Sequence, residues 1–87
     1  YPNRFEKLAV GKLRYGVICD EAGILLDDGT IARLGQERFF LTTTTGNADA
    51  IDSWFRAWLV RRPDWDVRLT NVSTGYAGMN IAGPKAR

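Results

Sequence analysis

The sequence contains no histidine and only one cysteine. Without histidine the chain lacks the commonest metal ligand and the side chain that most often acts as a base near neutral pH. A single cysteine cannot form a disulfide within the chain. We therefore expect no metal site, and no serine–histidine–aspartate hydrolase built from these residues alone.

Long apolar runs and strong net charge are also missing. No apolar run approaches the ~20 residues needed to span a bilayer, and the first residues do not follow the pattern of a signal peptide. The net charge is only +2. Residues 8–13 weakly resemble an RNA-recognition strand, but Ala9 stands where a base-stacking aromatic is required. We expect a cytoplasmic protein with no membrane or nucleic-acid partner.

The residues that are present suffice for one small core. Hydrophobic residues make up 45% of the 87-residue chain, and a domain of this size buries about 60% of its unfolded surface. The chain opens on Tyr1 instead of methionine and stops on the stretch GPKAR at 83–87. We interpret residues 1–87 as a single partial domain, a piece of a larger one.

Alternation of side chains and turn residues predicts several strands around a single helix. A helix over 48–62 would follow Asn47 as its N-cap and end before Pro63. Its apolar stripe comprises Ile51, Phe55, Trp58 and Leu59. The strands are expected at 13–20, at 24–34 with an undecided interruption at 27–30, at 39–45, at 67–72 and at 76–82.

This order predicts a two-layer α+β fold, in which one amphipathic helix covers one face of a mainly antiparallel sheet of about five strands. One helix covers only part of such a sheet, and an incomplete sheet has an exposed edge. We therefore expect that the chain can self-associate through that edge.

The candidate functional residues are Asp27, Asp28, Tyr15 and the threonines of 42–45. Adjacent strand residues point to opposite faces, so the two aspartates are not expected to share a proton. Locally, a turn before Gly29 is the favoured interpretation of the pair. The threonines could line a pocket or simply form a β-branched strand, and Tyr15 could stack on a ligand or fill the core.

Five motifs in a fixed order change the balance between these interpretations. They are KLRYG at 12–16, GILLDD at 23–28, RLG at 33–35 followed by RF at 38–39, TTTTGNA at 42–48 and GPKAR at 83–87. Together they resemble the glycine cleavage T-protein (aminomethyltransferase) family of folate-dependent domains. The threonine run makes the chain similar to the sarcosine oxidase alpha-subunit branch of that family.

The resemblance implies roles for four residues. Asp27 would lie on a strand, face tetrahydrofolate and stabilise positive charge while the one-carbon unit is received. Tyr15 would contact the folate. Thr43 matches a position that makes its contact through the backbone. Thr44 replaces the family asparagine that binds the pterin ring, which leaves pterin binding by this side chain open.

The resemblance also implies the activity of a whole protein. Its parent would oxidatively demethylate sarcosine to glycine and pass the one-carbon unit to tetrahydrofolate. FAD, FMN and NAD would bind elsewhere in the complex, and the partners would be the remaining alpha-subunit domains and the other sarcosine oxidase subunits. Two alternatives stay open: a non-catalytic ligand-binding or subunit-contact module of the same lineage, and a relative of dimethylglycine dehydrogenase.

Overall fold

The computed structural model describes residues 1–86, so Arg87, the last residue of the GPKAR motif, lies outside the described residues. The elements are β1 (Leu13–Cys19), β2 (Leu25–Gly35), β3 (Arg38–Leu41), the 3-10 turn η1 (Thr45–Asn47), α1 (Ala48–Arg61) and the 3-10 turn η2 (Ser73–Gly75). None of the described helices is long and apolar enough to cross a membrane.

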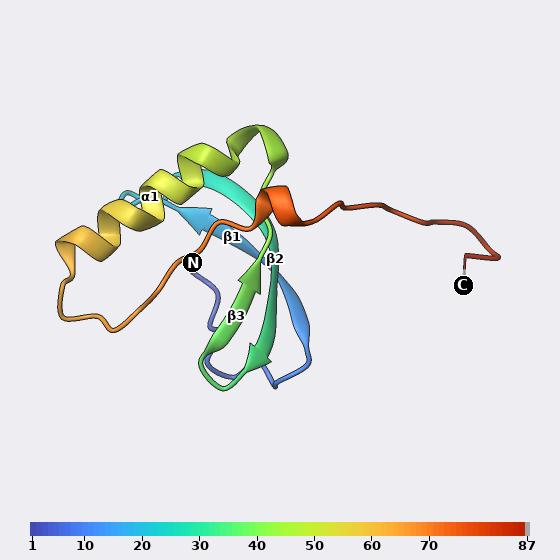
Figure 1. The fold of residues 1–87 in the computed structure, drawn as a ribbon, viewed down its shortest axis with the longest axis horizontal. Helices are drawn as coiled ribbons and strands as arrows, with labels where there is room; N and C mark the ends of the chain where they lie inside the picture. The colour runs from blue at the N-terminus through green and yellow to red at the C-terminus, as the bar shows by residue number, and fades with distance from the viewer. Residues whose placement is uncertain (87) are drawn as a thin grey trace.

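The sheet is antiparallel with the strand order β1-β2-β3, and α1 lies against one of its faces (Figure 1). The predicted α+β class with one helix is therefore confirmed. A polar hairpin turn lies in the gap left between the predicted strands 24–34 and 39–45, because β2 ends at Gly35 and β3 starts at Arg38.

The core is small and lies between the sheet and α1. Its fully buried apolar side chains are Leu8, Ile18, Ile31 and Ile51, each no more than 5% exposed. The predicted stripe of α1 is confirmed, since Ile51 is buried and its three companions are half-buried. α1 also carries an ion pair between Arg56 and Asp52 at 2.9 Å.

Arg33 fastens the N-terminal segment to the sheet. Its guanidinium donates hydrogen bonds to the carbonyls of Glu6 and Leu8, which belong to this segment, and to those of Gly35 and Gln36. One planar side chain thus donates to four carbonyls. The segment reaches α1 as well, where the Tyr1 and Phe55 rings stack with centroids 6.4 Å apart.

A β-bulge decides which way Asp27 points. Ile18 pairs with Asp27 but Cys19 pairs with Leu25, so Leu26 is an extra residue in β2. Asp27 therefore lies within a strand, and the local interpretation of a turn at this point is wrong. Bulges re-aim the side chains that follow them.

Asn47 donates a hydrogen bond to the carbonyl of the bulged residue, Leu26. The donor is Nδ2 of its side chain, at 3.0 Å from that carbonyl oxygen. The helix begins at Ala48, as predicted, but Asn47 makes no side-chain capping hydrogen bond. The prediction of its position is confirmed and the prediction of its capping bond is wrong, because the amide is used by the bulge.

Gly29 allows the chain to cross β2 directly after β3. A Cβ built on Gly29 would collide with the backbone carbonyl of Thr42, so only glycine admits this crossing. β3 accordingly ends at Leu41 and not at Thr45, where we expected its end. The Thr42 amide makes the last ladder-like bond, to the Thr30 carbonyl at 2.9 Å.

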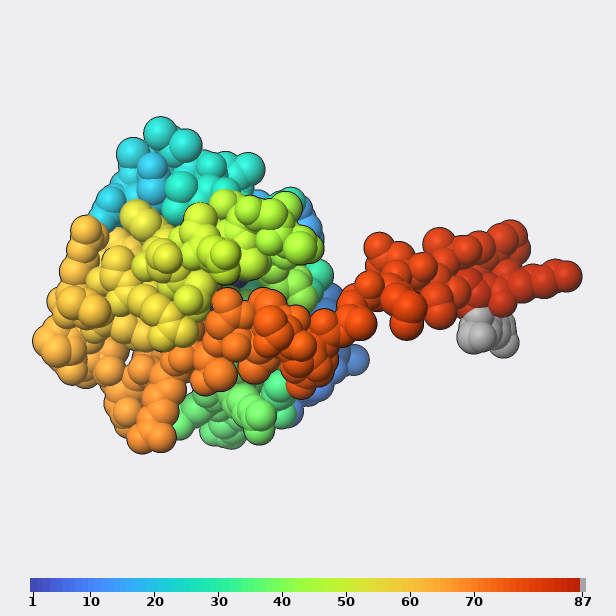
Figure 2. Space-filling view, turned by 45° about the horizontal axis from the view of Figure 1, so that its top comes forward, coloured from blue at the N-terminus to red at the C-terminus, as the bar shows by residue number. Residues whose placement is uncertain are grey.

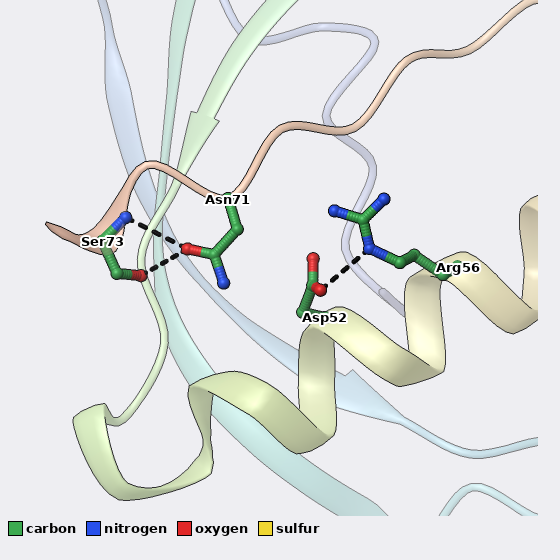
Figure 3. Close-up of polar contacts among 4 residues, drawn as sticks. All are labelled: Asp52, Arg56, Asn71 and Ser73. Carbon is green, nitrogen blue, oxygen red and sulfur yellow. Dashed lines mark hydrogen bonds and ion pairs between the residues drawn. The ribbon is translucent and has the colours of Figure 1, made fainter. Parts of the chain in front are cut away.

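The two strands expected at 67–72 and 76–82 are not confirmed. The Asn71 side chain accepts hydrogen bonds from the Ser73 amide at 3.0 Å and the Ser73 hydroxyl at 2.7 Å (Figure 3). Such local bonds turn the backbone away from a ladder, here into η2. Beyond η2 the chain leaves the body of the molecule (Figure 2), and an alternating sequence without a neighbouring strand forms no sheet.

Gly29→Ala tests the crossing. The added methyl group meets backbone, which cannot rotate away, so we expect the free energy of unfolding to fall by about 1–3 kcal/mol. Chemical denaturation followed by circular dichroism measures the change. Gly46→Ala is the matched control, because a Cβ at Gly46 meets nothing within 4 Å. Equal stability of the two variants would contradict the crossing.

Candidate functional site

Asp27 is the one buried charged residue on the helix-side face of the sheet within the described part of the chain, with 8% of its surface exposed. Directly opposed residues of an antiparallel pair share a face, so its pairing with Ile18 places Asp27 on the face that carries the core. A carboxylate is costly to bury without hydrogen-bond donors. The surroundings of Asp27 must therefore supply them.

Two residues, Thr44 and Asp28, supply three hydrogen-bond donors. Thr44 donates its hydroxyl to Oδ1 at 2.7 Å and its backbone N–H to Oδ2 at 3.0 Å. The backbone N–H of Asp28 donates to Oδ1 at 2.8 Å. Both carboxylate oxygens thus accept hydrogen bonds, and Thr44 alone donates to both of them.

These donors keep Asp27 ionised. Burial by itself raises the pKa of the carboxyl group, but the hydrogen bonds from the Thr44 hydroxyl and from the Asp28 and Thr44 amides, together with the nearby Asn47 side chain, favour the charged form. The hydrogen bonds prevail and the pKa of Asp27 lies below its ordinary value. At neutral pH the group is an anion and an acceptor, and it does not donate a proton.

The threonine run crosses from one face of β2 to the other instead of alternating along a strand. The Thr42 hydroxyl lies 2.8 Å from the Thr30 hydroxyl and accepts a hydrogen bond from the Thr30 amide at 2.9 Å. Two residues later Thr44 binds Asp27. Thr43, which is half-buried, lies between these two anchors.

Tyr15 does not join Asp27. It pairs with Thr30, which places it on the sheet face opposite to Asp27, and it is 57% exposed. The structure therefore brings together Asp27, Thr44 and the adjacent Thr43. Tyr15 lies instead beside the Thr30–Thr42 pair.

Two residues near the carboxylate were missed as site residues by sequence reasoning. Asn47 contributes to the lowered pKa of Asp27, and the TGN sequence after the threonines was a signal that we used only for capping. Burial, followed by the charge of Asp27, raises the pKa of the Tyr1 phenol to about 12. No periodicity in the N-terminal segment marked Tyr1.

The arrangement can do one thing chemically. A fixed, ionised carboxylate stabilises positive charge that develops beside it, because its orientation needs no adjustment during the reaction. Two shallow hollows of the surface lie elsewhere, one lined by residues 81–86 and the other by residues 1–2, 19–21 and 23.

Comparison with known proteins shows the family. A family model described as the GCVT N-terminal domain matches residues 1–87, the whole chain. The chain belongs to this family. The resemblance to the T-protein family inferred from the five motifs is confirmed.

Family relatives include proteins named sarcosine oxidase subunit alpha. The protein from Rhizobium meliloti (strain 1021) is 48% identical and that from Corynebacterium sp. (strain P-1) 41% identical, each over the whole chain. An aminomethyltransferase from Listeria monocytogenes serotype 4b is 31% identical over 97% of the chain. The chain spans 9% of the length of the two sarcosine oxidase subunits and 22% of that aminomethyltransferase.

The lowered pKa of Asp27 predicts how this GCVT domain responds to acid. Its folded-state pKa lies below the unfolded value, so the ionised carboxylate stabilises the fold above about pH 4. That contribution is lost as the pH falls through the folded-state pKa. Asp27→Asn should lower the free energy of unfolding at neutral pH by about 2 kcal/mol and flatten its decline in acid.

Urea denaturation at a series of pH values measures both effects. Asp28→Asn is the matched control, because Asp28 pairs with Val17 on the other face. If the two variants decline in acid in the same way as the unmodified chain, the hydrogen bonds to Asp27 contribute nothing to stability.

Proposed function

We propose that this chain is part of the folate-binding domain of a sarcosine oxidase alpha subunit. In this proposal the parent protein demethylates sarcosine to glycine and transfers the one-carbon unit to tetrahydrofolate. The 41–48% identity to proteins of that name supports it. FAD, FMN and NAD, and the other subunits, would meet parts of the complex outside these 87 residues.

The observation that carries the proposal is the state of Asp27. Tetrahydrofolate, when bound, supplies the nitrogen atoms that accept the one-carbon unit. A carboxylate that is buried, ionised and held by Thr44 fits a partner that presents N–H donors and gains positive charge. We assign Asp27 the role of orienting these nitrogens and stabilising that charge.

The internal hydrogen bonds leave Asp27 room for a ligand. A carboxylate offers about four lone-pair positions, of which two on Oδ1 and one on Oδ2 accept the bonds from Thr44 and Asp28. An approaching donor would meet Oδ2. Because the pKa of the group is lowered, the role is electrostatic and not that of a general acid.

The proposal gives Thr43 and Tyr15 different roles. Thr43 lies next to Thr44 and can offer its backbone to a ligand beside Asp27. Tyr15 lies on the opposite sheet face, so a folate that touches both Asp27 and Tyr15 would have to wrap around the end of the sheet. We therefore place Asp27 at the reacting nitrogens and assign Tyr15 at most a peripheral contact.

Asp27→Asn in the full-length protein that carries this chain tests the function. We expect formation of methylenetetrahydrofolate to fall about 100-fold, the size of effect seen when a transition-state electrostatic contact is removed. Consumption of sarcosine should persist, because the oxidation is assigned to another part of the protein. Both rates are measured on the same sample, with Asp28→Asn as the control.

The alternative is a non-catalytic module, in which Asp27 serves only to hold the threonine run. The hydrogen bonds by which the carboxylate already holds Thr44 favour that alternative. It predicts a less stable protein whose folate-dependent product is unchanged, and that result would overturn the proposed function.

A further inference from the structure

We propose that Thr44 is a positioning residue that fixes the Asp27 carboxylate toward the folate and does not itself bind the pterin. The inference rests on the proposed function and deepens it. It differs from the expectation drawn from the family, in which the side chain at this position contacts the pterin ring.

The geometry of the contact supports this role. One residue donates to both oxygens of the carboxylate, through its hydroxyl to Oδ1 at 2.7 Å and through its amide to Oδ2 at 3.0 Å. Two bonds from one residue to two oxygens resist rotation of the carboxylate about its last bond. The Asp28 amide, at 2.8 Å from Oδ1, opposes the same rotation.

Thr44 is itself held in place. Its carbonyl accepts a hydrogen bond of 2.9 Å from the Asn47 amide, while the Asn47 side chain is tied to the Leu26 carbonyl at 3.0 Å. The run is anchored on the other side at Thr42. A residue fixed at both ends can transmit a fixed orientation to the group that it binds.

The hydroxyl of Thr44 has no donor hydrogen left for a ligand. A hydroxyl carries one donor hydrogen, and here that hydrogen is committed to Oδ1. A pterin acceptor could take it only by releasing Asp27. An asparagine side chain, with two donor hydrogens and a carbonyl, could bind both, so the presence of threonine at this position favours the positioning role.

A double-mutant cycle in the full-length protein separates the two roles. Thr44→Val removes the hydroxyl and keeps the shape, and Thr44→Ala removes it without adding atoms. Each is made with Asp27 intact and with Asp27→Asn. Folate-dependent product formation and the Kd for a stable reduced folate are measured, and Thr45→Val is the matched control on the same turn.

We expect Thr44→Val to lower product formation about tenfold when Asp27 is present, and to change nothing further in the Asp27→Asn background. Thr44→Ser, which keeps the hydroxyl, should retain most of the rate. The acid limb of the pH profile should move to higher pH in Thr44→Val, because loss of the donor raises the pKa of Asp27.

Three other outcomes would contradict the positioning role, and they can be told apart. Losses that add in the double variant, together with a weaker Kd and an unmoved acid limb, mean that Thr44 touches the folate and overturn the positioning role alone. An unchanged rate in Thr44→Val and Thr44→Ala overturns it as well. An unchanged product rate in Asp27→Asn overturns the proposed function, and the positioning role with it.

Discussion

The pair of hydrogen bonds from Thr44 to the Asp27 carboxylate is the interaction on which the site depends. A charge with 8% exposure persists inside a small fold only if donors meet it. Here two of the three donors come from Thr44, 17 positions away in the sequence. The path of the chain after β3 is therefore set by the need to satisfy one carboxylate, and the threonine run leaves the sheet to do so.

Two structural devices make this path available. Gly29 has no side chain, so the backbone at Thr42 can pass directly over β2. The bulge at Leu26 turns Asp27 toward the core face and leaves a carbonyl that Asn47 satisfies. The GILLDDG stretch and the TTTTGN stretch thus act as one unit, although a linear description treats them as separate motifs.

The same hydrogen bonds serve both the stability of the fold and the chemistry of the site. The bonds that keep Asp27 ionised also hold the end of the sheet to the start of α1, since η1 follows Thr44 directly. A carboxylate that is preorganised by its fold loses little on meeting a positive charge, which is the property an electrostatic catalyst requires. The core that supports it is small, and Arg33 adds to it by binding the N-terminal segment.

The sequence by itself determined the class of fold, the helix with its apolar stripe from Ile51 to Leu59, the hairpin before β3 and the family. These follow from local periodicity, from turn residues and from motif order, all of which are properties of neighbouring residues. It did not determine the partners of Asp27, the use of Asn47, or the separation of Tyr15 from Asp27. Those depend on register, where one extra residue at Leu26 exchanges the two faces, and on contacts between distant segments, so only the tertiary structure decided them.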